Sequence, residues 1–532
     1  MVTRRGFLKA ATVSAGMAIL DSNHLLAQTV RPEHFALNEF VESHPDAVFV
    51  LRTNVDQKTN TSEIRAVGRE LGKTLFVGTR PSEHAFPVTG NVVIKPNATM
   101  WAWESKGPTE PTMGIQTDPH FVEGLIGSLN DLSVRSDTIH ISEANYSAAR
   151  IDGASYRDMA ARTGIKMKET RGITESVPTD VQWDVVPDGL WFRRIPHLWP
   201  VNSSGSCLIN VAKLKSHSMG MTLCCKNLQG TVAWPYVEQC TAWGTPIQGV
   251  DAGDVVPNAF ATIRANYERR KESIPRWKTL DGDDGAGSAG GLWMETHSSR
   301  CLDNNSVLSP MINIIEGVYG REGPFVSGPS TMGVGVDHMT NVVIFGKNAR
   351  HVDIVGTYLS GHEPGNFGFF HMALERGLSK FLDPHDIPMY EWRLDGSASL
   401  TSLASFPRVS LRTTYLRQAG EPEYHMVDQP YDYSSSRTSS ASPPTESDVF
   451  ALQQSFPYRP DLMSIQYHIP TSGKVRIEIL DDQGQVVDLL LDSYVLAGDH
   501  LVRWRSQSRA AGTYICHMLF DECGKTSAIV LN

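Results

Sequence analysis

Between residues 30 and 425, short apolar runs alternate with segments in which apolar residues recur at helical spacing. The apolar runs cover residues 91–94, 138–141, 311–315 and 342–345, and the helical segments cover residues 121–132, 156–163, 352–359 and 369–376. Strands that alternate with helices form layered α/β domains, because a parallel neighbour is reached only through a crossover connection. We therefore predict an α/β domain with a largely parallel sheet over residues 30–425.

Residues from about 240 to 310 interrupt this alternation. Residues 258–271 have the spacing of an amphipathic helix, and residues 281–291 are rich in Gly and Asp. A Gly/Asp-rich stretch of this kind is typical of a solvated loop. We interpret the whole segment as an insertion within the α/β domain.

The end of the chain has a different pattern, in which apolar and polar residues alternate with a period of two. Residues 475–480 and 485–489 flank a turn at Gly484, and further strand-like runs follow at residues 500–504, 514–520 and 527–531. Several short strands separated by turn signals predict a β-sandwich over residues 450–532. A Ser/Pro-rich stretch at residues 426–449 lacks apolar area to bury, so we interpret it as a linker.

The first residues have the organisation of a targeting signal. Arg4 and Arg5 precede Phe7-Leu8-Lys9, an uncharged stretch follows over residues 10–20, and a small residue stands at Ala27. The apolar stretch is much shorter than the roughly 20 residues that cross a bilayer as a helix. Residues 1–27 therefore resemble a twin-arginine signal peptide. We expect recognition by the twin-arginine translocation machinery and a periplasmic or extracellular location.

Charge and composition narrow the partners of the chain. The formal net charge is −10 and no basic stripe occurs, so nucleic acid is not an expected partner. No later segment has 18 uninterrupted apolar residues, so no stable membrane span is expected. The seven cysteines contain no Cys-x-x-Cys pair, which leaves no ligand framework for a zinc ribbon or a ferredoxin cluster. The cofactor is left unassigned.

Three stretches of the α/β domain carry a family resemblance. They comprise residues 93–97 with 117–119, residues 210–217 with 226–230, and residues 314–317 with 323–324, Asp353 and 373–378. In order and spacing they resemble the domain of unknown function 362 family, an uncharacterised group in which some members are described as iron–sulfur centre proteins. Those members carry an eight-cysteine segment that this chain lacks, and Ser216 stands where Thr is usual. No iron–sulfur cluster is therefore expected.

The C-terminal segment resembles a second kind of module. The resemblance rests on residues 452–460, residues 465–470, Gly484, and residues 497–498 ahead of Trp504. These features are similar to the Ig-like module shared by flagellar hook capping proteins and type IX secretion sorting domains. The resemblance implies a structural or address-like role.

A group of cationic residues lies in the second of the family stretches. Lys213, Lys215 and His217 alternate along a predicted strand and so share one face, and Lys226 and Asn227 follow soon after. Cations on one face repel one another unless an anion neutralises them. We predict that these residues bind an anionic small molecule, a carboxylate or a phosphate. The alternative is an exposed strand edge whose lysines are solvated.

Other polar residues follow predicted strands. Lys95 and Asn97 follow one strand, Glu143 follows the next, and Glu316 follows Ile315. Ligands of open α/β sheets gather beyond the carboxyl ends of the strands. We therefore predict Lys95 and Asn97 as further ligand-binding residues, and Glu143, His217 and Glu316 as acid/base candidates. The alternative for each acid is a helix cap or a turn.

A divalent metal is a secondary hypothesis for the same residues. Asp118, Glu143, His217 and Glu316 supply suitable donors, but none of their spacings is that of a known ligand pair, so no metal ligand is assigned. Cys224 and Cys225 beside Lys226 could form a reactive thiol pair, or could be inert core residues.

Two functions remain open at this point. The first is an enzyme of unknown reaction that acts on an anion, and the second is a non-catalytic binding protein sorted or displayed through its C-terminal sandwich. A redox protein that holds a metal through its cysteines is a third option. Convergence of Lys95, Glu143, His217 and Lys226 in one cleft would favour the enzyme, and scatter over the surface would favour the binding protein.

Overall fold

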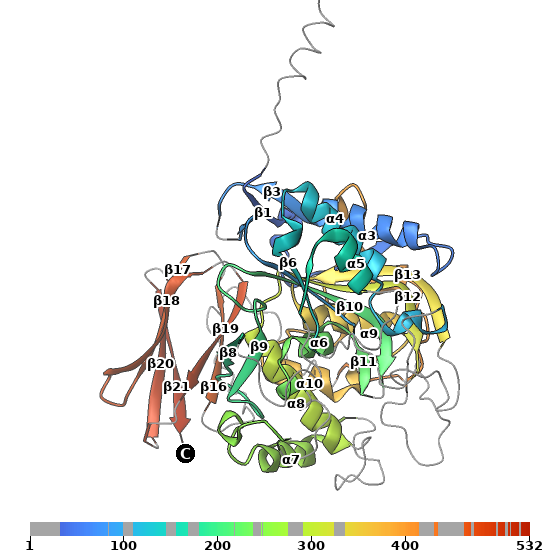
Figure 1. The fold of residues 1–532 in the computed structure, drawn as a ribbon. Coiled ribbons are helices and arrows are strands. Elements are labelled where there is room, and N and C mark those ends of the chain that lie inside the picture. Colours follow the sequence, from blue (N-terminus) through green and yellow to red (C-terminus); the bar gives the residue numbers. More distant parts are fainter. Residues whose placement is uncertain are drawn as a thin grey trace, which may run out of the picture.

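The computed structural model in Figure 1 describes most of the chain from residue 32 onward. The described residues are 32–82, 84–98, 110–144, 156–168, 180–217, 219–237, 246, 248–274, 291–323, 336–413, 430–434, 462–469, 473–495, 498–505, 509–510, 512–520 and 523–531. The predicted signal peptide at 1–27 lies outside this set, as does nearly all of the Gly/Asp-rich loop at 281–291. Of the predicted linker at 426–449, only residues 430–434 are described, so its assignment stays a prediction.

A large mixed sheet forms the centre of the main domain, in the order β15-β14-β2-β13-β12-β10-β5-β6-β7, with β11 paired to β10. Its strands are β2 (Val48–Arg52), β5 (Val92–Pro96), β6 (Ile139–Ser142), β7 (Lys166–Lys168), β10 (Cys207–His217), β11 (Gly220–Thr222), β12 (Ile312–Glu322), β13 (Val336–Gly346), β14 (Met389–Trp392) and β15 (Ala398–Leu400). The run from β12 through β10, β5 and β6 to β7 is parallel, and β14 is parallel to β2. β13 is antiparallel to both of its neighbours. The α/β prediction is confirmed, with a sheet that is mixed and mostly parallel.

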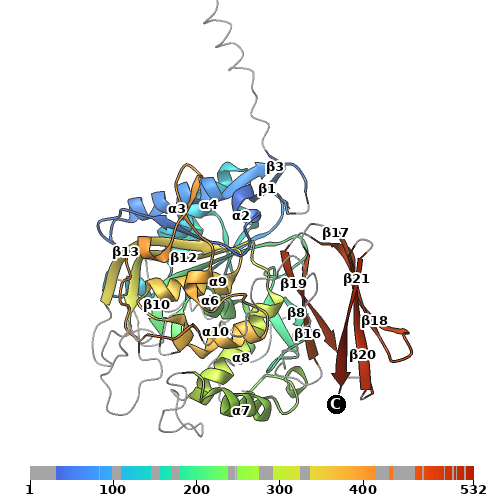
Figure 2. The same ribbon diagram turned by 180° about the vertical axis from the view of Figure 1, so that it is seen from behind.

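Helices cover both faces of this sheet (Figures 1 and 2). One layer contains α3 (Thr61–Leu75), α4 (Pro119–Asp131) and α5 (Tyr156–Thr163), and the other contains α6 (Cys224–Asn227), α7 (Ala259–Arg270), α8 (Gly291–Val307), α9 (Ala349–Leu359) and α10 (Gly368–Glu375). The first layer buries residues such as Leu71 and Phe121 against one face of the sheet. The second buries residues such as Leu302 and Ile354 against the other. Alternate residues of each central strand therefore belong to different cores.

Two small antiparallel sheets flank the main domain. β1 (His34–Leu37) pairs with β3 (Phe76–Thr79) and β4 (Phe86–Pro87), and β8 (Val181–Val185) pairs with β9 (Arg194–Leu198). A short helix, α2 (Glu39–Glu42), follows β1. No helix within the described ranges is both long enough and apolar enough to cross a lipid bilayer.

The helices and strands that were predicted for the main domain match elements of the structure, but α3 and strands such as β2 and β14 were not predicted. The segment 156–163 coincides with α5, and 258–271 contains α7. α8 was not predicted, because its sequence is rich in Ser, Thr, Asn and His and shows no apolar stripe. Its polar residues are nevertheless buried, and Asn305 bonds to the Cys225 carbonyl at 2.9 Å. Tertiary contacts therefore stabilise this helix where its own propensity is low.

The C-terminal part is all-β, as predicted, and forms two antiparallel sheets. One pairs β16 (Leu462–Ile469) with β19 (Gly498–Arg505), and the other has the order β18 (Val486–Val495), β17 (Gly473–Leu480), β20 (Gly512–Phe520) and β21 (Cys523–Leu531). Ile465, Ile477, Trp504 and Cys516 belong to one hydrophobic cluster that joins the two sheets. The predicted turn lies at Gly484, which has a φ of +76°.

Candidate functional site

The predicted site residues lie near the carboxyl ends of β5, β6 and β10, in the short helix α6, and within β10 and β12, where Lys213 pairs with Glu316. Eight of the nine are buried, and Lys226 is only partly buried. Charged side chains are rarely buried without a partner, so the bonds of each one determine what it is free to do. The structure sorts these residues into two groups on opposite faces of the sheet.

The first group centres on Lys95 and Glu143. The Lys95 ammonium lies 2.8 Å from Glu143 Oε2, and it also donates to the Pro96 carbonyl at 2.6 Å and to Asn227 Oδ1 at 3.1 Å. Three acceptors use all three N–H donors of the ammonium. Burial lowers the pKa of Lys95, against the opposing effect of Glu143. Lys95 therefore acts first as an internal counterion that fixes Glu143 and Asn227.

Asparagine side chains extend this first group across the sheet. Asn227 donates to the Lys95 carbonyl and to Asn210 Oδ1, both at 2.8 Å, and Asn210 donates to Asn313 Oδ1 at 2.8 Å. These bonds fix the short helix α6 above the strands. Asn97 is held through its backbone, and its buried Oδ1 accepts no hydrogen bond from any residue that the structure describes.

The second group lies on the face covered by α3 and α4. The Lys213 ammonium lies 2.6 Å from Glu316 Oε2 and 3.3 Å from the centre of the Tyr319 ring. Tyr319 donates to Asp118 Oδ2 at 2.7 Å, and Asp118 also bonds to His120. Strand alternation places Lys213 and Glu316 with Ile209 and Ile314 of this core, whereas Lys95 shares the face of Val93 in the other core. The pair is thus separated from Lys95 and Glu143 by the sheet itself.

Burial has different consequences within this second group. It raises the pKa of Glu316 despite the opposing charge of Lys213, and it raises the pKa of Tyr319 well above its usual range. Burial also acts to raise the pKa of Asp118, but hydrogen bonds from His120 and Tyr319 outweigh it and leave that pKa below its usual value. The Lys213–Glu316 pair is therefore a satisfied internal network.

Lys215 and His217 lie at the end of β10, both buried. The Lys215 ammonium donates to the Ile115 carbonyl at 2.7 Å, and burial together with Lys226 lowers its pKa well below the usual range. Burial, Lys226, Lys215 and His297 likewise hold the pKa of His217 far below its ordinary value. His217 Nδ1 accepts the Met219 N–H at 3.0 Å, so the neutral ring carries its proton on Nε2.

Lys226 is the cation that connects these residues. Its charge lowers the pKa of Lys95, of Lys215 and of His217. Within the described part of the chain, the Lys226 ammonium has no ion pair and no hydrogen bond. Lys95 and Glu143 are thus in direct contact, and the charge of Lys226, which has no partner among the described residues, acts on Lys95 and on His217.

Asp353 of α9 fixes the short helix α6, which carries Lys226, through hydrogen bonds to its backbone. The Asp353 carboxylate accepts the Cys224 N–H at 2.7 Å and the Cys225 N–H at 2.8 Å. Burial raises the pKa of Asp353 to about 7, although these N–H groups act in the opposite direction. Asp353 thus sets the position of α6 and of its two site residues, Lys226 and Asn227.

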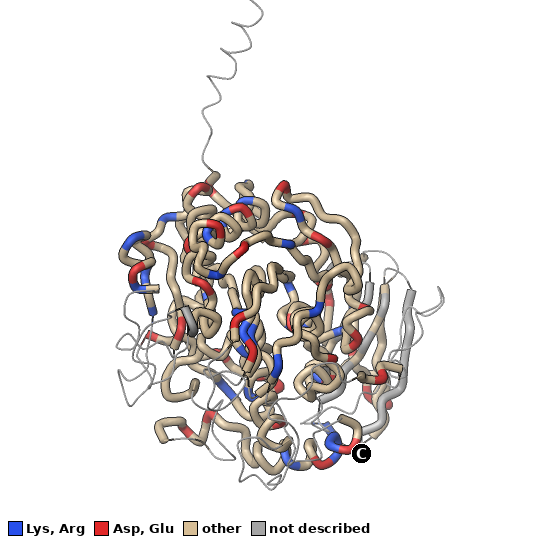
Figure 3. Tube along the Cα trace, turned by 90° about the vertical axis from the view of Figure 1, so that its right-hand side faces the viewer, with Lys and Arg blue, Asp and Glu red and all other residues tan. Residues whose placement is uncertain are grey.

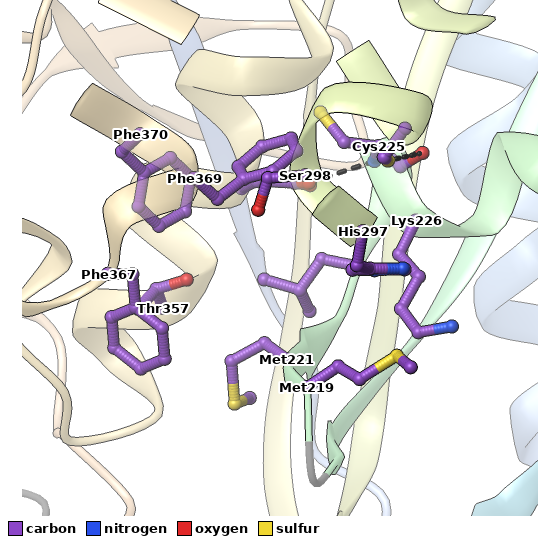
Figure 4. Close-up of a pocket in the computed structure, with 13 residues that line it drawn as sticks. Met219, Met221, Cys225, Lys226, His297, Ser298, Thr357, Phe367, Phe369 and Phe370 are labelled. Atoms are coloured by element: carbon purple, nitrogen blue, oxygen red, sulfur yellow. Dashed lines mark hydrogen bonds between the residues drawn. The ribbon is translucent and has the colours of Figure 1, made fainter. Parts of the chain in front are cut away.

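A pocket adjoins Lys226 on the side of α8, α9 and α10. Its apolar wall consists of Met219, Met221, Leu223, Phe367, Phe369 and Phe370. Its polar lining residues are Lys226, His297, Ser298, Asp353 and Thr357, and Cys225 and Cys301 complete the wall. Figure 4 shows the phenylalanines on one side, Lys226 and His297 on the other, and the Lys226 ammonium pointing away from the phenylalanines. Sequence reasoning missed His297, Ser298 and Thr357, because single polar residues within helices carry no recognisable signal.

The four donors considered for a metal do not meet in one place. Asp118 and Glu316 are neighbours, since the Asp118 N–H donates to Glu316 Oε2 at 3.2 Å, whereas Glu143 is paired with Lys95. Within the ranges that the structure describes, no group of three His, Cys, Asp or Glu residues could hold a metal ion.

Figure 3 shows basic and acidic residues interspersed along the main domain.

Comparison with known proteins identifies one family. The family model described as Domain of unknown function (DUF362) matches residues 92–358, which is half of the chain. This range begins at β5, ends within α9 and contains all nine predicted site residues. No curated protein matches the chain.

Proposed function

The chain belongs to the Domain of unknown function (DUF362) family, and from this premise we propose that it binds a small organic anion beside Lys226. The observation that carries the proposal is the Lys226 ammonium, which forms no ion pair and no hydrogen bond with the described residues and whose charge lowers the pKa of two other lysines. A carboxylate or phosphate at this position would offset the positive charge. Ligands of open α/β sheets also gather beyond the carboxyl ends of strands, where β5, β6 and β10 end.

The balance of charge near Lys226 supports an anion rather than a cation. Glu143 is the carboxylate of the first group, and it is already bonded to Lys95 and to the Ala98 N–H. Lys215 donates to the Ile115 carbonyl, and repulsion from Lys226 contributes to its low pKa. A bound anion would relieve this repulsion, because opposite charges within a few ångströms favour the charged form of a lysine.

We favour an enzyme over a simple binding protein. Lys95, Glu143, His217 and Lys226 come from three separate stretches of sequence, and the Lys95–Glu143 contact together with the effect of Lys226 on Lys95 and His217 supports one shared site. Burial and the neighbouring cations favour the neutral form of His217, so this residue adds no further positive charge to the site. Glu143 shares the face of Lys95, to which it is bonded, whereas Glu316 would act only indirectly from the opposite face.

One observation favours the alternative, a non-catalytic binding protein. Both carboxylates proposed as acid/base groups already accept hydrogen bonds from a lysine and from a backbone N–H. A carboxylate engaged in this way is a poor general base unless the ligand displaces a partner. Incubating the full chain with a mixture of organic acids and phosphate esters, then following them by mass spectrometry, separates the two functions: depletion supports the enzyme, and retention without change supports the binding protein.

The binding proposal is tested by calorimetric titration of the full chain with inorganic phosphate and with acetate. We expect at least one of the two to bind, and Lys226→Met to weaken that binding about tenfold or more, because one close charge pair is lost. Lys73→Met is the matched control, since Lys73 is an exposed residue of α3 that pairs with Glu70. Equal affinities for the wild type and Lys226→Met would remove the basis of the proposal.

We further propose that the chain is exported by the twin-arginine route and that its C-terminal part is an Ig-like module for sorting or display. The Arg4-Arg5 pair and the short apolar stretch support export, and two antiparallel sheets around one core support the module. Arg4→Lys with Arg5→Lys should leave the chain in the cytoplasm of a host that has this pathway. Unchanged export of that variant would contradict the route. Deletion of residues 450–532 should alter the final location without blocking export.

A further inference from the structure

The pocket beside Lys226 contains hydroxyl groups that lack partners. Thr357 of α9 is fully buried, and its Oγ1 accepts and donates no hydrogen bond among the described residues. Ser298 of α8 is 4% exposed and also has no side-chain hydrogen bond within that part of the chain. Figure 4 shows the Thr357 oxygen directed toward the space between the phenylalanines and Met221. Buried hydroxyls normally have partners, so this space is suited to a group that supplies one.

Most of the remaining wall is apolar, although Asp353, His297 and two cysteines also line it. Phe367, Phe369 and Phe370 lie opposite Met219 and Met221, and methionine side chains adapt readily to the shape of a ligand. Small-molecule sites typically combine such walls with a few polar groups that fix orientation. The space for solvent-sized atoms is about 40 Å³, which is room for roughly three water molecules. A group of about three carbons would fill it, and a large ring system would not.

We propose that this pocket binds the uncharged part of the anion held by Lys226, and that the ligand is a short-chain organic acid carrying one hydrogen-bonding oxygen. The inference rests on the proposed function, because it assigns the charged end of the ligand to Lys226. The apolar chain lies against Phe369 and Met221, and the oxygen meets the Thr357 hydroxyl. The positive charge of Lys226 selects only for an anion. The shape and polarity of the pocket then define which class of organic anion would bind.

The test compares acetate, butyrate and the positional isomers of hydroxybutyrate, titrated into the full chain. Butyrate has two more methylenes than acetate, and burying both should tighten binding about tenfold. The hydroxybutyrate isomer whose oxygen reaches Thr357 should bind more tightly than butyrate. Lys226→Met should weaken the binding of every probe, since all of them share the carboxylate.

Thr357→Val separates the role of the hydroxyl from that of the charge, because valine keeps the shape and removes the oxygen. This variant should bind acetate and butyrate as the wild type does, and should lose the preference for the hydroxylated acid. Thr163→Val is the control, since the Thr163 hydroxyl bonds to the Met159 carbonyl within α5. Thermal unfolding of both variants confirms that they are folded.

Each outcome supports or overturns a separate statement. If butyrate binds no more tightly than acetate while Lys226→Met still abolishes binding, the anion site stands and the pocket holds only water. If the hydroxyl preference survives Thr357→Val, the assignment of Thr357 is wrong. If no probe binds the wild type, or if Lys226→Met changes nothing, both the proposed function and this inference fail together.

Discussion

Gly230 lies directly against the ion pair that Lys95 forms with Glu143. A Cβ atom at Gly230 would overlap Glu143 Oε1 and would lie 2.5 Å from Lys95 Cε and 2.7 Å from Lys95 Nζ. The Gly230 carbonyl also accepts the Ala144 N–H at 2.8 Å, so the chain after α6 cannot shift freely. The missing side chain at Gly230 is what allows this segment to close over the pair.

Gly230→Ala should therefore separate the pair and lower the free energy of unfolding by about 2–4 kcal/mol, because an overpacked core and a broken buried ion pair act together. Urea unfolding measures this change. Gly512→Ala is the control, since nothing lies within 4 Å of a Cβ atom there. An equal, small effect for both substitutions would show that the loop relaxes and that the close approach at Gly230 is unimportant.

The Lys213–Glu316 pair should show strong coupling in a double-mutant cycle. Lys213→Met leaves the buried Glu316 carboxylate without its cation, and Glu316→Gln leaves the buried ammonium without its carboxylate. Each single substitution should cost about 3–5 kcal/mol of stability, and the double variant should cost less than the sum of the two. Additive losses, measured by urea unfolding, would show that the two side chains do not stabilise each other.

The cysteines of the α/β core should resist alkylation in the native protein. Burial raises the pKa of Cys207, and burial together with Asp353 raises the pKa of Cys224 and Cys225 well above the usual range. The thiolate is the reactive form, so reaction with iodoacetamide at pH 8 should require unfolding. Peptide mapping by mass spectrometry locates the modified residues. Rapid labelling of Cys225 in the folded chain would restore the hypothesis of a reactive thiol pair.

Local sequence pattern predicted the elements of the fold, because apolar periodicity reports which face of each strand or helix is buried. It placed α5 and the first part of β12 correctly, and it identified the alternation of Lys213 and Lys215. It missed α8, where polar residues are buried through contacts with distant segments. No local sequence pattern encodes such contacts, so α8 could not be predicted without the tertiary structure.

The sequence was sufficient to predict which residues belong to the candidate site, but not which of them form ion pairs with each other. Lys95, Glu143 and Glu316 each follow a run of apolar residues that predicts a strand, so we expected all three at the same edge of the sheet. The face on which each side chain lies depends on register and on strand order, and these place Glu316 on the other side of the sheet from Glu143. The sequence identified Lys226 by its residue type and its neighbours. Only the structure shows that, among the described lysines of the site, Lys226 alone lacks a partner.

The pH dependence of stability should report the protonation of Asp353. Burial raises its pKa to about 7 in the folded protein, against about 3.9 in an unfolded chain. Between these values the folded state holds a proton that the unfolded state has lost, so stability falls as the pH rises and levels off above about pH 7. The contribution that is lost amounts to about 4 kcal/mol. Burial also raises the pKa of Glu295 to about 7, so Glu295 adds to the same slope.

Asp353→Asn isolates the contribution of Asp353 from that of Glu295. Asparagine has no proton to lose, so the difference in unfolding free energy between the wild type and this variant should decrease from pH 5 to pH 8, as the wild type alone acquires a buried charge. Urea unfolding at four pH values across this range measures the difference. A difference that stays constant with pH would mean that Asp353 remains ionised throughout, held by the Cys224 and Cys225 N–H groups.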